Sequence, residues 1–237
     1  MPTRIWLSPS SLLTADSALA GRWLQLLSEP ERERLARYRT EPQKHAFLSS
    51  RGLLRSALGT VCNMHPAELS FTANTAGKPR LAFDQSPHFS LSHSGQWMAL
   101  AIDDQQPIGL DLEHPQKTRD IMAIARHYYH PQETQRLAEL DEPARNREFY
   151  RLWTLKEAFF KARGTGISEG LHRICINPGA GVPTASFDLP ALGAPRPEHL
   201  YYRFQPAGIQ NVHLALARPQ ASSAPEIAIF SSNHLII

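Results

Sequence analysis

The chain has 237 residues, of which 42% are apolar and 20% are charged, and its formal net charge at pH 7 is +3. This composition suits a hydrophobic core and is not typical of a disordered chain, and the length suits one large or two small domains. The first residues contain no secretory signal, and no run approaches the roughly 20 apolar residues that a membrane-spanning helix needs. We therefore expect a globular, cytoplasmic, monomeric protein without a membrane partner.

The cysteines, histidines and basic residues exclude further classes of protein. Cys62 and Cys175 are far apart, and the 11 histidines show no metal-ligand spacing, so reduced thiols are expected and a zinc site is not. One arginine-rich run, ERERLARYR at 31–39, is most simply a solvated helix face, although it could contact a phosphate or an acidic partner. Because no stacking aromatics accompany a basic stripe, no nucleic-acid partner is expected.

The first half of the chain reads as helices followed by short strands. Apolar residues at helical spacing predict helices over 20–27, 28–38 and 43–59. After a turn at 66–69, alternation and turn residues predict strands at 70–73, 80–83, 88–92 and 97–102. The polar stretch 103–107 is the expected boundary between two halves.

The second half repeats this order of elements. A strand is predicted at 108–112, helices at 120–126, 131–140 and 145–163, and strands at 173–176, 186–189, 201–205 and 212–217. We therefore predict an α+β fold with an N-terminal half over 1–104 and a C-terminal half over 105–217. The tail, 218–237, is expected either to pack against the body or to be disordered.

The strand IGLDLE, residues 108–113, ends in two acids. Side chains alternate along a strand, so Asp111 and Glu113 share one face, opposite the apolar residues of the run. Two like charges on one face need a cation between them, which lysine, arginine or a divalent metal could supply, and oxygen ligands favour magnesium. The alternative is a strand end that enters solvent.

The stretch FYRLWTLKEAFFKARGTG, residues 149–166, predicts a helix with two distinct faces. Its apolar face is formed by Leu152, Leu155, Phe159 and Ala162. Trp153, Glu157 and Lys161 recur every fourth residue and form a separate stripe. A Glu–Lys pair at this spacing is common on surfaces, but a tryptophan on the same stripe indicates that protein or ligand covers it. Glu157 would then be a third carboxylate for the acids of the strand.

Two further motifs carry polar side chains. In FSLSHS, residues 89–94, His93 follows alternating serines at the end of a strand, where a histidine is more often structural than catalytic. In AGKP, Lys78 lies between Gly77 and Pro79, so its backbone is restricted and its ammonium could reach a phosphate, although alone this motif is only a turn.

The chain resembles the Sfp-type 4′-phosphopantetheinyl transferases in four motifs, which occur in the order GKP, FSLSHS, IGLDLE and W-x-x-K-E-A-x-x-K-x-x-G-x-G. The resemblance is strong over 77–166 and holds in general layout outside that range. The resemblance implies a pseudodimer of two similar halves, each a small antiparallel sheet packed on a long helix, with coenzyme A as co-substrate between them. It also implies the reaction, which is transfer of the 4′-phosphopantetheinyl group to a serine of an apo acyl, peptidyl or aryl carrier protein, with release of adenosine 3′,5′-bisphosphate.

The resemblance assigns the metal and catalytic residues. Asp111, Glu113 and Glu157 match the magnesium ligands of the family, with manganese as an alternative ion. Lys161 matches a lysine near the pyrophosphate, and His93 matches a residue that contacts the nucleotide phosphates. For the base that takes the serine proton we expect Glu157, with His93 as the lesser candidate.

The same resemblance assigns the coenzyme-binding residues. Ser92 belongs to the matching SHS motif, and 77–79 match a loop that lines the coenzyme site. The match is poor where the family reads the 3′-phosphate, and Arg51 is the expected reader, with Arg34 and Arg39 behind it. A segment at 121–129 could dock the carrier protein or belong to the core.

Two other classes of function remain open from the residues alone. Three acids and a lysine would also serve a metal-dependent phosphodiesterase or nuclease, although the GKP and SHS motifs argue against that class. A binding module for coenzyme A or carriers, without catalysis, would require a degraded site, whereas every motif acid is present.

Overall fold

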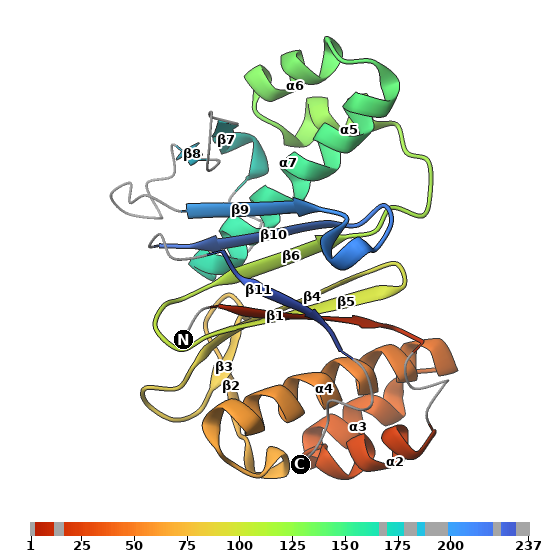
Figure 1. The fold of residues 1–237 in the computed structure, drawn as a ribbon, viewed down its shortest axis with the longest axis vertical. Coiled ribbons are helices and arrows are strands. Elements are labelled where there is room, and N and C mark those ends of the chain that lie inside the picture. The colour runs from red at the N-terminus through yellow and green to blue at the C-terminus, as the bar shows by residue number, and fades with distance from the viewer. Residues whose placement is uncertain are drawn as a thin grey trace.

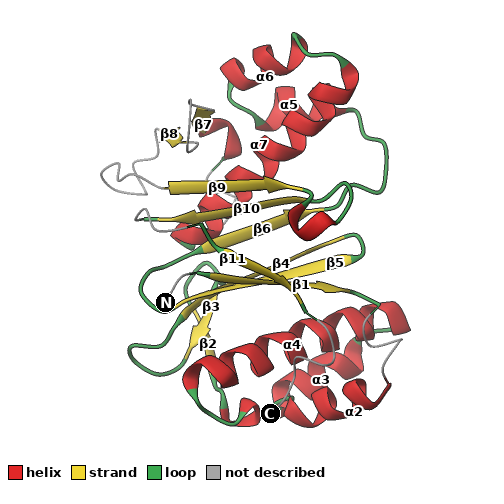
Figure 2. Ribbon diagram, viewed as in Figure 1, coloured by secondary structure: helices red, strands yellow, loops and turns green. Residues whose placement is uncertain are grey.

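The computed structural model describes residues 3–11, 17–165, 170–177, 184–187, 199–219 and 224–230. Within these ranges the molecule is built in layers, with helices at both ends and two sheets between them (Figures 1 and 2). The predicted α+β class is confirmed. The internal symmetry that a pseudodimer requires stays a prediction.

The N-terminal helices cover one face of a four-stranded sheet. The sheet has the order β11 (Glu226–Ile229), β1 (Arg4–Pro9), β5 (Trp97–Asp103) and β4 (His88–Ser94). The helices below it are α2 (Ser17–Leu26), α3 (Glu29–Arg37) and α4 (Glu41–Cys62) (Figure 1). Between helices and sheet lies a core that includes Trp23, Leu53, Leu100 and Phe230. A hairpin of β2 (Phe71–Ala73) and β3 (Pro79–Leu81) lies at the side of this half.

The C-terminal half has its own sheet and helices. Its antiparallel sheet has the order β6 (Gly109–Glu113), β10 (His213–Arg218) and β9 (His199–Phe204). The helices α5 (Ile121–Tyr128), α6 (Pro131–Ala138) and α7 (Glu142–Arg163) lie on the far side of this sheet (Figure 1). A small pair, β7 (Ile174–Asn177) and β8 (Thr184–Phe187), lies beyond β9.

Local sequence explains where α7 begins and ends. The Asp141 carboxylate accepts a hydrogen bond from the amide of Ala144, and an N-cap of this kind satisfies one of the free amides of the first turn. Gly164 ends the helix at φ +70°, a left-handed conformation that glycine adopts without steric cost. The apolar face predicted for this helix is buried, because Leu152, Leu155 and Phe159 are fully covered.

The two sheets face each other across a shared apolar layer. It contains Ile5 and Leu7 of β1 and, from the other sheet, Leu110, Leu112 and Leu214. The predicted boundary at 103–107 begins at the last residue of β5 and continues into the link to β6. The division of the chain into domains at 1–104 and 105–217 remains a prediction.

Sequence patterns missed two adjacent strands of the four-stranded sheet. β1 was not predicted, and it pairs antiparallel with β5 and parallel with β11. β11 belongs to the tail, so the described part of the tail packs against the body, and Phe230 is buried beside Trp23. The predicted strand at 80–83 begins earlier, at Pro79. The predicted strand at 186–189 ends, in the described residues, at 187, and 188–189 lie outside them.

Candidate active site

The site is built on the face of β6 that packs against α7. A Cβ atom placed on Gly109 would lie 2.0 Å from the carbonyl oxygen of Ala158 and 2.1 Å from the amide nitrogen of Ala162. Glycine at this position therefore allows the strand to touch the helix backbone. The next two side chains on the same face are Asp111 and Glu113, which are thereby held beside α7.

Lys161 supplies the cation that Asp111 requires. Its ammonium lies 2.6 Å from Asp111 Oδ1, and the Asp111 side chain is only 5% exposed. The Ser92 hydroxyl donates a second hydrogen bond to the same oxygen, at 2.8 Å. Burial raises the pKa of Asp111, while the charge of Lys161 and the bonds from Lys161 and Ser92 oppose that rise.

The serines of β4 attach that strand to β6. The hydroxyls of Ser90, Ser92 and Ser94 accept hydrogen bonds from the amides of residues 110, 112 and 114, at 2.9, 3.2 and 3.1 Å. Ser94 also donates to Glu113 Oε2 at 2.7 Å. Hydroxyl groups thus take the place of carbonyls along this edge of β6 and orient both acids.

Glu157 completes the group of acids from the α7 side. The pKa of Glu157 is raised to about 7, chiefly by burial and also by the charges of Asp111 and Glu113, while the charge of Lys161 opposes the rise. For Glu113, burial again raises the pKa, as does the charge of Asp111, and the hydrogen bond from Ser94 opposes the rise. The three acids therefore lie within electrostatic reach of one another, and Lys161 lies among them.

The carboxylate oxygens of this site are suited to bind a divalent cation. Asp111 Oδ2 is buried and, in the described structure, has no hydrogen-bond partner. A buried carboxylate oxygen without a donor is costly, and a cation would satisfy it. No three His, Cys, Asp or Glu side chains in the described ranges lie close enough to hold a metal as they stand. The assignment of Asp111, Glu113 and Glu157 as metal ligands remains a prediction.

The GKP loop is close to the site, but the ammonium of Lys78 already donates hydrogen bonds to backbone carbonyls. Lys78 Nζ donates to the carbonyls of Ile108, at 2.8 Å, and Ala162, at 3.3 Å. The carboxamide of Asn74 donates to the Gly164 carbonyl at 2.9 Å and accepts from the Lys78 amide. Through these hydrogen bonds the loop, in which Gly77 has φ +84°, connects the start of β6 to the end of α7. Whether it lines a coenzyme site, together with Pro79, stays a prediction.

The other two predicted residues, His93 and Arg51, lie on β4 and α4. His93 is exposed on β4, and strand alternation puts it on the opposite face from Ser92 and Ser94. Arg51 lies on α4, 3.8 Å from Glu31 Oε1, with its guanidinium over the Phe47 ring. Burial lowers the pKa of Arg51, and the charge of Glu31 opposes this.

The segment predicted to serve either docking or the core does contribute to the core. Ile121, Ala125 and Tyr129 are buried there, whereas Tyr128 is 44% exposed. Trp153, on the α7 stripe, lies near the rings of Phe149, Tyr128 and Tyr129, with centroids 6.1 to 6.4 Å away. These aromatic rings therefore cover part of the Trp153 side chain, which belongs to the stripe of Trp153, Glu157 and Lys161.

Sequence reasoning missed the hydroxyl of Ser94, the carboxamide of Asn74 and a buried ion pair. Ser94 was visible in the S-x-S-x-S alternation, which puts three hydroxyls on one face of β4. The ammonium of Lys156 lies 2.8 Å from Glu133 Oε2, and both side chains are fully buried between α6 and α7. Nothing in the local sequence distinguishes this fully buried lysine from Lys161, whose side chain is 32% exposed.

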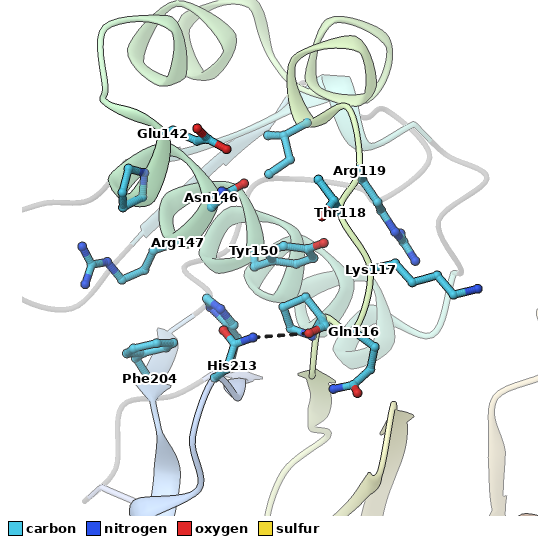
Figure 3. Close-up of a pocket in the computed structure, with 14 residues that line it drawn as sticks. Gln116, Lys117, Thr118, Arg119, Glu142, Asn146, Arg147, Tyr150, Phe204 and His213 are labelled. Carbon is cyan, nitrogen blue, oxygen red and sulfur yellow. Dashed lines mark hydrogen bonds between the residues drawn. The ribbon is translucent and has the colours of Figure 1, made fainter.

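Two cavities of similar size lie at opposite ends of α7. One, of about 480 Å³, is lined by Lys78, Pro79 and Arg163 at the C-terminal end. The other, of about 500 Å³, is lined by Tyr150 and Asn146 towards the N-terminal end and by the segment that follows Glu113 (Figure 3).

Comparison with known proteins identifies the family. A family model described as 4′-phosphopantetheinyl transferase, N-terminal, matches residues 17–105, and one described as the 4′-phosphopantetheinyl transferase superfamily matches residues 107–217. The 4′-phosphopantetheinyl transferase Sfp of Bacillus subtilis is 32% identical over 156 residues, which are 65% of this chain and 68% of Sfp. The transferase HetI of a Nostoc strain is 35% identical over 146 residues, covering 60% of this chain and 62% of HetI.

Among solved structures, a Thermotoga maritima holo-[acyl-carrier-protein] synthase is 19% identical with a TM-score of 0.39, covering 49% of this chain and 64% of that one. The two family models cover both halves in succession, and the Sfp alignment covers more than two thirds of the length of Sfp. The chain is therefore an enzyme that belongs to the 4′-phosphopantetheinyl transferase family.

Proposed function

We propose that the chain transfers the 4′-phosphopantetheinyl group from coenzyme A to a serine of apo carrier proteins, and that the reaction depends on magnesium. The observation that carries this proposal is the set of three acids and one lysine gathered between β6 and α7. Such a set suits a diphosphate, because a cation held by acids and an ammonium together neutralise its charge.

In the proposed reaction the serine oxygen bonds to the phosphorus that carries the pantetheine arm. The bond from that phosphorus to the bridging oxygen breaks, and adenosine 3′,5′-bisphosphate leaves with the bridging oxygen. The serine proton passes to a carboxylate, for which Glu157 is our choice.

Lys161 has two tasks in this proposal. Its ammonium lies 2.6 Å from Asp111 Oδ1, so it orients that carboxylate, and its charge is available to the phosphate oxygens. A magnesium ion held by Asp111, Glu113 and Glu157 would supply Lewis-acid neutralisation of the diphosphate, and manganese is the alternative ion.

The nucleotide part of coenzyme A is proposed to lie towards the C-terminal end of α7. The GKP loop and the adjoining cavity of about 480 Å³ support this placement, since both lie at that end. Ser92 and His93 of β4 and Arg51 of α4 remain the candidates for phosphate contacts. A cytoplasmic, monomeric enzyme without nucleic-acid or membrane partners stays our expectation, and no helix in the described residues is long and apolar enough to cross a membrane.

Incubation of the chain with coenzyme A, magnesium and an apo acyl or peptidyl carrier protein tests the proposal directly. We expect the carrier to gain one phosphopantetheinyl group by intact mass spectrometry and the bisphosphate to appear in equal amount. Omission of the metal, with chelator present, is expected to abolish both products. Carriers of the acyl, peptidyl and aryl kinds that all stay unmodified would refute the proposal.

The role of Glu157 is tested by its isosteric amide. Glu157→Gln removes the base and one metal ligand, so we expect kcat to fall by about 10² to 10⁴. The exposed Glu139→Gln, on the link between α6 and α7, is the matched control and is expected to retain full activity. Unchanged kcat in Glu157→Gln would assign the proton transfer to another group, with His93 tested next.

A further inference from the structure

A buried ion pair joins α6 to α7 and takes no part in the reaction proposed above. The ammonium of Lys156 lies 2.8 Å from Glu133 Oε2, and neither side chain is exposed to solvent. Successive residues of an α-helix are about 100° apart around its axis, so Lys156 points almost opposite to Ala158, two residues further on. The backbone of Ala158 lies against Gly109 of β6. The helix α7 is therefore held by β6 on one side and by this ion pair on the other.

The ammonium of Lys156 uses all three of its donor positions. Besides its bond to Glu133, it donates to the carbonyl oxygen of Leu171, at 2.9 Å, and to that of Ile174 in β7. Leu171 belongs to the short 3₁₀ helix Leu171–Arg173, which comes directly before β7. Lys156 thereby attaches α7 to α6 and also to the segment that leads into β7.

The carboxylate of Glu133 is bonded through both of its oxygens. Its Oε1 accepts a hydrogen bond from the Ile176 amide of β7 at 2.7 Å, and its Oε2 accepts one from the His130 amide at 3.1 Å, beside the bond from Lys156. The bond from His130 caps the first turn of α6. One carboxylate therefore sets the start of α6, its distance from β7 and the place of the Lys156 ammonium.

Stability alone does not account for a pair of this kind. Transfer of two charges out of water is costly, and replacement of a buried ion pair by apolar side chains of similar volume is often neutral or stabilising. The pair supplies direction, because each hydrogen bond restricts a distance and an angle, whereas hydrophobic contacts are non-directional. A buried polar network that is fully satisfied rigidifies the elements that it joins. This network therefore restricts the rotation of α7 about its own axis.

We propose that Lys156 and Glu133 are positioning residues, which set the rotation of α7 and thereby the place of the Glu157 carboxylate; this inference rests on the function proposed above. Glu157 follows Lys156 directly, about 100° further round the helix. A helix with its side chains has a radius of about 5–6 Å, so a rotation of about 10° moves a carboxylate by about 1 Å. A displacement of about 1 Å at a reacting group can lower a rate about 100-fold.

The experiment separates position from stability with single and double variants. Lys156→Met and Glu133→Gln each leave a buried polar group without its charged partner, so both are expected to unfold at lower urea concentration than the wild type. The double variant Lys156→Met/Glu133→Gln has no unpaired charge and is expected to regain part of that stability. Because it lacks the directional bonds, its kcat for transfer to a carrier protein is expected to stay about 10- to 100-fold below that of the wild type.

Leu58→Ala is the matched control for lost stability. Leu58 is fully buried in a core cluster of the N-terminal half that contains no residue of α7, and its truncation leaves a cavity. This variant is expected to unfold at lower urea concentration and to keep the kcat of the wild type. All variants are assayed at a temperature at which circular dichroism shows them to be folded.

Glu133→Asp tests the same point with the charge retained. Its side chain is one methylene shorter, so the carboxylate cannot keep its bonds to Lys156 and to both amides without a shift of α6 towards α7. We expect kcat to fall at least about tenfold, as a displacement of a fraction of an ångström to 1 Å at Glu157 implies.

Three results would overturn the inference. In the first, kcat of the double variant recovers in step with its stability, or Glu133→Asp keeps the kcat of the wild type. In the second, Leu58→Ala loses as much kcat as the double variant. In the third, the effect is confined to the KM for the carrier protein, which would assign the pair to docking of the carrier.

Failure of this inference is distinguishable from failure of the proposed function. A wild-type chain that modifies no carrier protein refutes the function itself. A wild-type chain that modifies a carrier, together with a double variant of equal kcat, refutes only the positioning role of the ion pair.

Discussion

At the scale of single residues, the site depends on hydroxyl groups that hold carboxylates. Ser92 accepts a hydrogen bond from the Leu112 amide of β6, Ser94 accepts one from the amide of His114 just after β6, and each donates one to an acid of β6. A hydroxyl can do both at once, because it has one donor and two acceptor positions. These serines therefore fix both the spacing of the strands and the direction of the acids.

Removal of the Ser94 hydroxyl is expected to weaken metal binding. Ser94→Ala frees the Glu113 carboxylate to rotate, and loss of such a supporting hydrogen bond typically costs about 10- to 100-fold in metal affinity. Calorimetric titration with magnesium or manganese measures the effect. Ser94→Thr, which keeps the hydroxyl, should recover most of the affinity, and an alanine variant that binds metal normally would exclude this positioning role.

Protons are expected to compete with the metal at Glu157. Its pKa of about 7 in the metal-free chain means that the carboxyl is largely protonated at pH 6 and largely ionised at pH 8. Since a ligand must be deprotonated, apparent metal affinity should fall as the pH is lowered through 7, and binding at pH 6.5 should release a proton. Calorimetry in two buffers of different ionisation enthalpy counts that proton. Affinity that is flat between pH 6 and 8 would contradict the pKa.

At the scale of elements, the site depends on how closely β6 approaches α7. Lys161 and Glu157 can meet acids of the strand because Gly109 has no side chain to separate the two elements. Asn74 and Lys78, which belong to the N-terminal half, donate hydrogen bonds that hold the same two elements together. The geometry of the acids is thus a consequence of packing between a strand and a helix.

Gly109→Ala is expected to damage both stability and the site. The new methyl group would lie about 2 Å from backbone atoms of α7, so β6 must shift, and overpacking of this kind typically costs about 1–3 kcal/mol. Urea unfolding and metal titration should both show the loss. Gly21→Ala is the control, since a Cβ there meets nothing within 4 Å and should stabilise helix α2 by about 0.5–1 kcal/mol.

At the scale of the whole molecule, the two halves share one apolar layer. Leu7 and Ile5 of one sheet and Leu110, Leu112 and Leu214 of the other are essentially fully buried against each other. Separation of the halves would expose this layer to water, which is unfavourable by about 25 cal/mol per Å² of apolar surface. The halves are therefore expected to depend on each other for stability.

A single cooperative unfolding transition is the expected result. In native-state hydrogen exchange, the slowest amides of β5 and β10 should share one free energy of opening, equal to that of global unfolding by urea. Two groups of amides with clearly different opening energies, one in each half, would contradict this and would favour two independent domains.

Patterns along the chain were sufficient for α4, α7 and most strands, because burial of one helix face or one strand face leaves a periodic trace. They were not sufficient for β1 or β11. β1 lies within the first ten residues and pairs with distant segments, and β11 is a four-residue strand that pairs with β1. The resemblance to a known family, carried by local motifs, also assigned Asp111, Glu113, Glu157 and Lys161 to one site.

The sequence by itself determined the family, the α+β class and the types of side chain available for the chemistry, because these follow from local order and spacing. Only the tertiary structure decided that Lys161 neutralises Asp111, that Ser94 holds Glu113, that Lys78 bonds to carbonyls, and that a cavity lies beyond the acids. These features join residues 19 to 84 positions apart, and contacts at such separation are set by the packing of sheets and helices and leave no periodic trace in the chain.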